Sequence, residues 1–218
     1  MKFVDHSIPP LTRIDSPEGR VYQTITGNVY PSVTSVVGYL SQEHIQEWKN
    51  KVGEAVAKEI SKRATARGSL IHENCERFLR GDPLSFGMFD SDSKKMWENF
   101  LPILRRIEEV HAMETQMWSD KLEVAGTVDL IAKIDGKLCI LDWKTSSRYK
   151  TADDIEDYFM QTAAYSFMFY ERTGLIINDL YIAMTTEEFG LLEFKVKSKE
   201  WLPKFVDLRQ QYKLKFGK

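Results

Sequence analysis

The chain has 218 residues, of which 43% are hydrophobic, and its 30 basic and 32 acidic side chains leave a formal net charge of −2. This is the composition of one substantial soluble domain or two small ones. The balanced charge excludes a globally basic nucleic-acid-binding protein, so any DNA-binding surface must be local. The two cysteines, Cys75 and Cys139, cannot supply a four-cysteine metal site and are expected to be buried thiols in a reducing compartment.

The N-terminal sequence MKFVDHSIPPLTRID has no apolar h-region and is not an Arg/Ser-rich, acid-poor leader. No apolar run approaches the length of a membrane span. We therefore expect a cytoplasmic protein without a membrane anchor. No repeat or flexible linker divides the chain, which predicts one domain over 1–218. Within it we expect a lead-in and helix over 1–66, a core over 67–198 and a closing helix over 199–218.

The N-terminal part predicts an irregular or short-stranded lead-in, with a turn at Gly27-Asn28 between VYQTITG and VYPSVTSVV. From Ser41, which can cap a helix, the pattern becomes helical until Gly68, which should break the helix. A second helix is expected over 69–80, where Gly81 stops it. The first helix is predicted by apolar residues at three- and four-residue steps: Trp48, Val52, Val56 and Ile60.

A third helix is expected to begin near Asp90–Ser93 and to end near His111, with Pro102 kinking or dividing it. The period then changes: METQMWS, VAGTVDLIAKI and KLCILDWKTS predict three strands, with a hairpin turn at Asp135-Gly136. A helix over about 152–172, strands at LYIAMTT and LLEFKVK, and a closing helix from about Lys199 follow. This order predicts an α/β fold, a central mixed β-sheet flanked by helices, with helical additions at the N-terminal side.

A two-residue hairpin fixes the register of its strands, and this one places Asp129 directly opposite Asp142, with Cβ atoms about 5 Å apart. Lys144 projects from the same side as Asp142. Two close carboxylates among apolar neighbours repel each other unless a cation lies between them, and Mg²⁺ suits such a pair because it also accepts phosphate oxygens. Lys144 could orient or help deprotonate the attacking water and stabilise developing charge. A Lys–Asp cross-strand ion pair on a solvated face fits this pattern equally well.

Five motifs follow one another in the chain: YPSVT at 30–34, RGSLIH at 67–72, GTVD at 126–129, LDWKT at 141–145 and QTAAY at 161–165. The third and fourth resemble the signature of PD-(D/E)XK nucleases in their RecB-like exonuclease form. The second resembles the RG-[ST]-x-x-H motif of that branch, and the fifth its QxxxY motif. The first resembles the PSVT segment of phage and mitochondrial genome maintenance exonucleases. The resemblance spans roughly residues 20 to 200.

The resemblance implies a restriction-endonuclease-like αβββαβ core in which Asp129, Asp142 and His72 bind a metal ion. It also implies that the backbone carbonyl of Trp143 often joins them and that Lys144 is the catalytic lysine. The implied cofactor is Mg²⁺, and Mn²⁺ should substitute because imidazole suits it better. Some relatives hold an iron–sulfur cluster through flanking cysteines, which this chain lacks, so no cluster is expected. The absence of a transit peptide favours a bacterial or phage setting.

Residues around this centre allow two interpretations each. His72 alone is more typical of an ordinary helix residue, and only its motif favours ligation. Gln161 and Tyr165 share a helix face. In one interpretation Tyr165 is a core residue and Gln161 is solvated. In the other, Gln161 reaches the site, and Tyr165 supports it or stacks on a base. Glu114 is expected to be exposed by its pattern, although relatives often place an acid here that contacts the site through water or the lysine.

Ser32, Thr34 and Arg67 are candidates for binding the phosphate next to the cut, although turn chemistry after a proline also explains the first two. Lys58 and Lys62 lie on the helix leading to Arg67 and predict a phosphate-tracking groove, unless they form an ordinary wet face. The ordinary interpretation is favoured for the basic closing helix, with Lys204, Arg209, Lys213, Lys215 and Lys218.

The sequence therefore predicts a Mg²⁺-dependent DNA exonuclease of recombination, repair or replication, with Asp129, Asp142, Lys144 and Gln161 as catalytic residues. Its substrate would be single-stranded or end-containing DNA. Two alternatives stay open: a structure-selective or restriction-type endonuclease with the same centre, and a nucleic-acid-binding module that does not cut.

Overall fold

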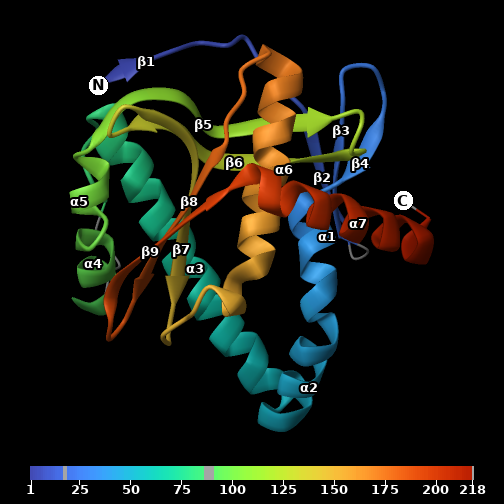
Figure 1. Ribbon diagram of the computed structural model, residues 1–218. Helices are drawn as coiled ribbons and strands as arrows, with labels where there is room; N and C mark the ends of the chain where they lie inside the picture. The colour runs from blue at the N-terminus through green and yellow to red at the C-terminus, as the bar shows by residue number, and fades with distance from the viewer. Residues whose placement is uncertain (17–18, 86–90, 218) are drawn as a thin grey trace.

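A six-stranded mixed sheet forms the centre of the protein, in the strand order β1-β5-β6-β7-β8-β9 (Figure 1). The computed structural model describes residues 1–16, 19–85 and 91–217. Strands β5, β6 and β7 are antiparallel neighbours, whereas β7 and β8 run parallel. The predicted α/β fold is confirmed. The strands are β1 (Lys2–Phe3), β5 (Ile107–Ser119), β6 (Val124–Ile134), β7 (Lys137–Ser146), β8 (Asp179–Thr186) and β9 (Gly190–Lys197).

Helices cover both faces of the sheet. On one face, α1, α6 and α7 pack on a core that includes Val128 and Ile140. On the other, α3, α4 and α5 pack on a core that includes Leu130 and Leu141. Across the described residues, no helix has the length and apolar character needed to cross a membrane. The helices of these two layers are α1 (Val33–Gly38), α3 (Glu54–Arg80), α4 (Ser91–Glu98), α5 (Leu101–Leu104), α6 (Glu156–Thr173) and α7 (Ser198–Phe216).

The predicted lead-in is more regular than expected. It folds into a small antiparallel sheet, and a single bridge between Ser32 and Ala125 links its end to β6. The segment VTSVVG, expected to continue an irregular or stranded region, is helix α1. Its three valines, Val33, Val36 and Val37, are spaced three and four residues from the first, so a helix buries all three against α6. The small sheet consists of β2 (Thr12–Ser16), β3 (Gly19–Gln23) and β4 (Val29–Pro31).

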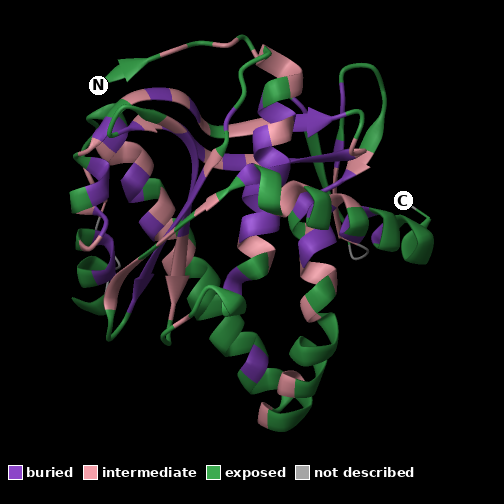
Figure 2. Cartoon of the chain, viewed as in Figure 1, coloured by how far each residue is buried: buried purple, intermediate pink, exposed green. Residues whose placement is uncertain are grey.

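A helical arm connects the small sheet to the core: η1 (Tyr39–Ser41) and α2 (Gln42–Val52) lead into α3. The predicted helix break at Gly68 is wrong. The chain breaks at Gly53, where φ is +87°, and α3 runs through Gly68 and past the predicted boundary at 66–67. A Cβ on Gly68 would lie 3.7 Å from Thr145 Oγ1, so the glycine lies where the helix approaches β7. Figure 2 shows α2 and the first half of α3 as largely exposed.

Two further expectations need correction. Ser41 makes no capping hydrogen bond; its Oγ donates to the Gly38 carbonyl at 3.1 Å. The helix expected to end at His111 is two short helices, with Pro102 in the first turn of α5, and β5 begins already at Ile107. Strand pairing with β6 decides the conformation of 107–111 over the local pattern. Helix α4 begins at Ser91, within the start expected near Asp90–Ser93, and Asp90 itself lies outside the described residues.

Candidate active site

The predicted site lies where β6 and β7 separate. The two strands pair in the predicted register as far as Leu130 and Leu141. The ladder ends there, one position before Asp129 and Asp142, so the two aspartates are not the regular cross-strand pair that was expected. Instead, Asp129 Oδ2 accepts a hydrogen bond of 3.0 Å from the backbone N–H of Trp143. The side chain of Asp129 is thereby fixed against β7 at the point where the strands separate.

Asp142 is almost completely buried, with 1% of its surface exposed. Its Oδ1 accepts a hydrogen bond of 2.9 Å from Gln161 Nε2, and its Oδ2 lies 2.5 Å from Lys144 Nζ. Burial raises the pKa of Asp142 to about 7, a rise that Lys144 opposes and Asp129 reinforces. The structure therefore brings Asp142, Lys144 and Gln161 together on the α6 side of β7.

Lys144 is held as an ammonium ion. Burial lowers its pKa, but the carboxylates of Asp142 and Asp129 outweigh burial and raise the pKa above its ordinary value. A lysine in this state donates protons and hydrogen bonds and stabilises negative charge, and it does not accept a proton from water. Of the two roles expected for Lys144, orienting groups and stabilising charge fits the geometry, and deprotonating water does not.

On the α3 side, His72, Glu114 and Asp129 form a group whose potential ligand atoms all lie within 4.8 Å of one another. His72 Nδ1 is 3.5 Å from Asp129 Oδ2. The structure thus brings the predicted ligand His72 to Asp129, and it places Glu114 in the same group. Glu114 was expected from its alternating pattern to point into solvent; it comes instead from β5 to the edge of the site.

The backbone at Glu114 is unusual. Its φ is +46°, a left-handed conformation that is uncommon for a residue other than glycine. The β5–β6 ladder skips Glu114 and Asp129 although residues on both sides are paired. Loss of solvation and the neighbouring carboxylates, Asp129 foremost, raise the pKa of Glu114 to about 7. Strained conformations of this kind persist mainly at functional sites, where the surrounding structure holds them.

The donor set fits a divalent cation. It combines one imidazole nitrogen with carboxylate oxygens, which suits Mn²⁺ and, with water, Mg²⁺. Oδ2 of Asp142 is buried, and the ammonium of Lys144 lies 2.5 Å from it. The carboxylates of Asp129 and Asp142 help to raise the pKa of Glu114, and that of Asp129 helps to raise the pKa of Asp142, a repulsion that a bound cation removes. The Trp143 carbonyl stays a predicted ligand.

Two residues that the sequence did not single out contact this centre from α6 and its start. The Tyr158 ring centroid lies 4.6 Å from Lys144 Nζ, a cation–π contact. Asp157 adds negative charge near Lys144. Tyr158, Gln161 and Tyr165 are three and four residues apart, so they share one face of α6. That spacing was the sequence signal by which Tyr158 could have been found.

Two predicted DNA contacts do not lie on the surface. Tyr165 has 1% of its surface exposed, so it cannot stack on a base, and it supports Gln161 from within the core. A Cβ on Gly126 would lie 2.9 Å from Tyr165 Cε1, which explains the glycine in GTVD. Ser32 is also 1% exposed, and its Oγ accepts from the Ser35 N–H at 2.9 Å as the N-cap of α1. Turn chemistry accounts for Ser32.

The remaining DNA-binding candidates are accessible to different extents. Thr34, Lys58 and Lys62 are exposed. Arg67 is partly buried and forms an ion pair with Glu187. The closing helix follows the ordinary interpretation: Lys204 pairs with Glu156, and Arg209 and Lys213 both contact Glu123, while Lys215 lies over the Tyr39 ring. Lys218 lies outside the described residues.

Carboxylates on three adjacent strands, an imidazole from α3 and a buried lysine form a set of side chains that suits a metal-binding hydrolase. The sequence matches the PD-(D/E)XK nuclease superfamily over residues 44–211, and the chain belongs to that superfamily. Members of this superfamily use divalent metals, and both the recognised family and the hydrolase class predicted from the sequence are confirmed.

Among curated proteins, the chain is similar to mitochondrial genome maintenance exonuclease 1 of Homo sapiens, with 28% identity over 168 residues, and of Mus musculus, with 26% over 167 residues. Each alignment covers 69% of this chain and 49% of the relative. The chain thus spans about half the length of the curated relatives it matches. Among solved structures, that of SSO0001 aligns with a TM-score of 0.43 and 15% identity over 82% of this chain and 72% of that one.

Proposed function

We propose that this protein is a divalent-metal-dependent deoxyribonuclease that shortens DNA from its ends. One observation carries the proposal: the His72–Glu114–Asp129 group lies beside the buried Asp142, which holds the ammonium of Lys144. A metal ion and a fixed cation next to the scissile phosphate both stabilise the negative charge that develops during phosphodiester hydrolysis. The exonuclease names of the curated relatives support action at ends.

His72, Glu114, Asp129 and Asp142 would hold the cation, with the Trp143 carbonyl as a further predicted ligand. A bound divalent cation supplies Lewis-acid stabilisation of phosphate charge and a more acidic water. Lys144 contributes a permanent positive charge that can donate a hydrogen bond to a non-bridging phosphate oxygen. Gln161 fixes the rotamer of Asp142, and Tyr158 keeps the ammonium from turning away. Mg²⁺ is our proposed physiological ion, and Mn²⁺ our proposed substitute.

A cleft of about 450 Å³ supports a single strand as the substrate in the site. The start of the helical arm forms one wall, with Leu40 and His44, and the segment between β7 and α6 forms the other, with Arg148 and Asp157. Asp157 also interacts electrostatically with Lys144, which supports a position of this cleft near the proposed catalytic lysine. A cleft of this size admits a flexible strand more readily than a duplex.

The test is a degradation assay on end-labelled linear and covalently closed DNA, each single- and double-stranded, with Mg²⁺, Mn²⁺ or chelator. The proposal expects metal-dependent loss of linear DNA while closed circles survive. Cutting of closed circles would instead establish the endonuclease alternative. Binding without degradation under every metal condition would establish the non-cutting module. The curated relatives are mitochondrial proteins, so the expected phage or bacterial setting stays a prediction.

A further inference from the structure

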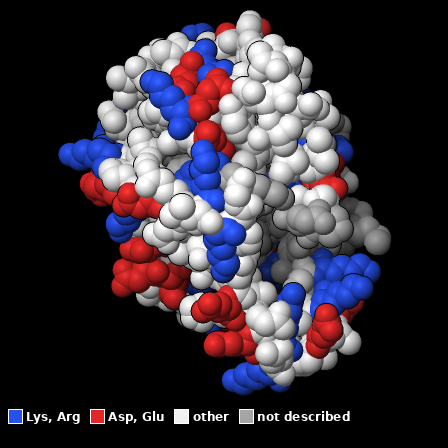
Figure 3. Space-filling view, turned by 90° about the vertical axis from the view of Figure 1, so that its right-hand side faces the viewer, with Lys and Arg blue, Asp and Glu red and all other residues white. Residues whose placement is uncertain are grey.

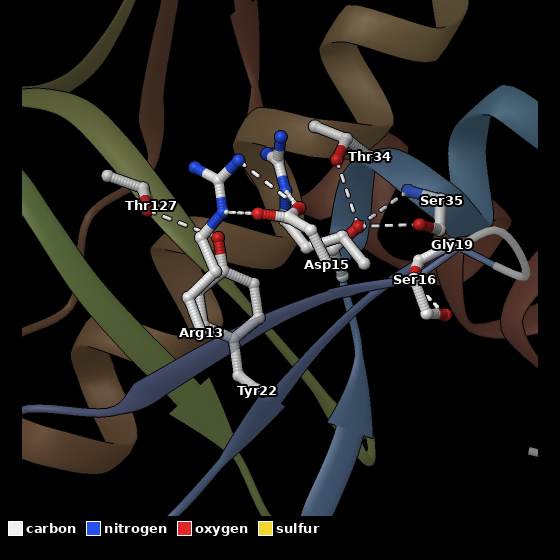
Figure 4. Close-up of polar contacts among 10 residues, drawn as sticks. Arg13, Asp15, Ser16, Gly19, Tyr22, Thr34, Ser35 and Thr127 are labelled. Atoms are coloured by element: carbon white, nitrogen blue, oxygen red, sulfur yellow. Dashed lines mark hydrogen bonds and ion pairs between the residues drawn. The ribbon is translucent and has the colours of Figure 1, made fainter.

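Two arginines of the small sheet converge on one carboxylate. We call the antiparallel pair of β2 and β3 the ribbon. Arg13 donates to Asp15 through Nε at 2.8 Å and through Nη2 at 3.2 Å, and Arg20 donates through Nε at 3.0 Å. Pairing of Arg13 with Tyr22, and of Asp15 with Arg20, puts all four on one face of the ribbon. Figure 4 shows Arg13 and Asp15 near Thr34 and Ser35.

This face of the ribbon adjoins the active-site strand. Tyr22 is buried against Ala125, and its hydroxyl lies 3.3 Å from Thr127 Oγ1. Thr127 precedes Asp129 by two residues on β6, a separation of about 7 Å along a strand. Both residues are only partly buried. Thr127 therefore lies between the predicted metal group and Tyr22, the residue that pairs with Arg13.

The arginine cluster has the composition of an anion site. Two guanidiniums against one carboxylate leave an excess of one positive charge. Their side chains are 43% and 37% exposed, and Asp15 is 58% exposed, so the ion pairs contribute little to stability. Each guanidinium carries about five N–H donors, and Asp15 engages only some of them. Charged groups are otherwise interspersed by sign on the face shown in Figure 3, so binding must use local groups of this kind.

We propose that Arg13 and Arg20 bind a backbone phosphate of the DNA strand that occupies the active site, next along the strand from the cleaved phosphate. Carboxylate and phosphate oxygens accept the same forked hydrogen bonds from arginine. Asp15 therefore occupies the phosphate position in the free protein and keeps both guanidiniums oriented. Thr34, exposed on the same side, is placed to donate to the same strand. The inference rests on the proposed nuclease function and adds a substrate-positioning site to it.

The test measures binding of a fluorescein-labelled single-stranded oligonucleotide by anisotropy over a range of salt, with Mg²⁺, in a Lys144→Met background that prevents cutting. Arg13→Ala/Arg20→Ala should weaken binding roughly 10- to 100-fold, since charge-assisted contacts are lost. It should also reduce the slope of log K against log salt by about 0.7. The matched control is Arg106→Ala, which removes a comparable forked contact with Asp135 at the far end of β6 and β7 and should bind normally.

Asp15→Asn separates binding from structural support. If the arginines bind phosphate, removing the competing carboxylate charge should tighten binding several-fold. If the cluster only braces the ribbon, Asp15→Asn should weaken binding like the arginine variant, and that result would overturn the inference. It would also be overturned by an unchanged affinity and salt slope in the double variant. If the Lys144→Met protein with both arginines intact bound no DNA at all, the proposed nuclease function itself would fail. Failure of the arginine site and failure of the proposed function are therefore distinguishable.

Discussion

Two glycine-to-alanine substitutions near the site should change stability in opposite directions. Gly126 and Gly68 both lie in motifs of the nuclease signature, and neither has a positive φ. At Gly126, a Cβ would lie 2.9 Å from Cε1 and 3.1 Å from the hydroxyl of Tyr165. Tyr165 is enclosed in the core and has no room to retreat. At Gly68, the nearest atom is Thr145 Oγ1 at 3.7 Å, an ordinary contact.

The expected magnitudes follow from these contacts. Gly126→Ala overpacks a rigid aromatic ring and should cost about 1–3 kcal/mol of unfolding free energy. For a protein of this size that lowers the melting temperature by about 2–4 °C per kcal/mol. Gly68→Ala replaces a mid-helix glycine without a clash and should stabilise by about 0.5–1 kcal/mol. Displacement of Tyr165 also moves Gln161, so Gly126→Ala should lose activity along with stability.

Urea unfolding followed by circular dichroism measures both effects, with the transition midpoint and the m-value fitted separately. The two variants should shift the midpoint in opposite directions at an unchanged m-value. A Gly126→Ala protein as stable as wild type would show that Tyr165 does not pack as tightly on β6 as the structure indicates. A destabilised Gly68→Ala protein would refute an uninterrupted α3.

Three further predictions follow from the site. The pKa values of Asp142 and Glu114 are raised to about 7, so their protonation stabilises the metal-free fold fully below about pH 4, and that contribution is lost as pH rises through about 7. The melting temperature of the protein in chelator should therefore decrease as the pH is raised from 5.5 to 8.5. Added Mn²⁺ or the substitution Glu114→Gln should reduce this dependence on pH. A melting temperature that does not change with pH would contradict the prediction. Tyr158→Phe should keep near-normal activity, because it preserves the cation–π contact, while Tyr158→Ala should lower kcat roughly 2- to 30-fold; equal rates for both would exclude that role. Gln161→Ala should lower kcat about 10- to 100-fold by freeing a buried carboxylate, whereas Gln161→Glu should be worse, because it adds a like charge; a wild-type rate for Gln161→Glu would contradict this.

The sheet around the site could be predicted from the sequence because its signals are local. Alternation along β6 and β7 and the turn at Asp135-Gly136 fix both strands and their register. Lys144 follows Asp142 by two residues, so its side of the strand was determined as well. Helix boundaries were less predictable. Gly68 lies where α3 approaches β7, and the sequence alone does not distinguish a glycine at a close contact from a glycine that ends a helix.

What could not be predicted depends on three-dimensional contacts. The strands separate one pair before Asp129 and Asp142, because Asp129 takes the Trp143 N–H. Glu114 enters the group through a left-handed backbone that no propensity favours. Burial of Tyr165 could not be read from a motif that gives spacing alone. The β2–β3 ribbon carried no family motif, so its arginines stood out only when the fold placed them beside Thr127.

The rate of DNA cleavage as a function of Mn²⁺ concentration, for wild type and Asp129→Asn, tests the central claim most directly, because Asp129 joins both halves of the site. The wild-type rate should be zero in chelator and rise to saturation. Asp129→Asn removes the charge of a proposed metal ligand, so the variant should need at least about tenfold more Mn²⁺ and reach a far lower rate. Cleavage by wild type in chelator, or superimposable curves for the two proteins, would contradict a metal-dependent centre at Asp129.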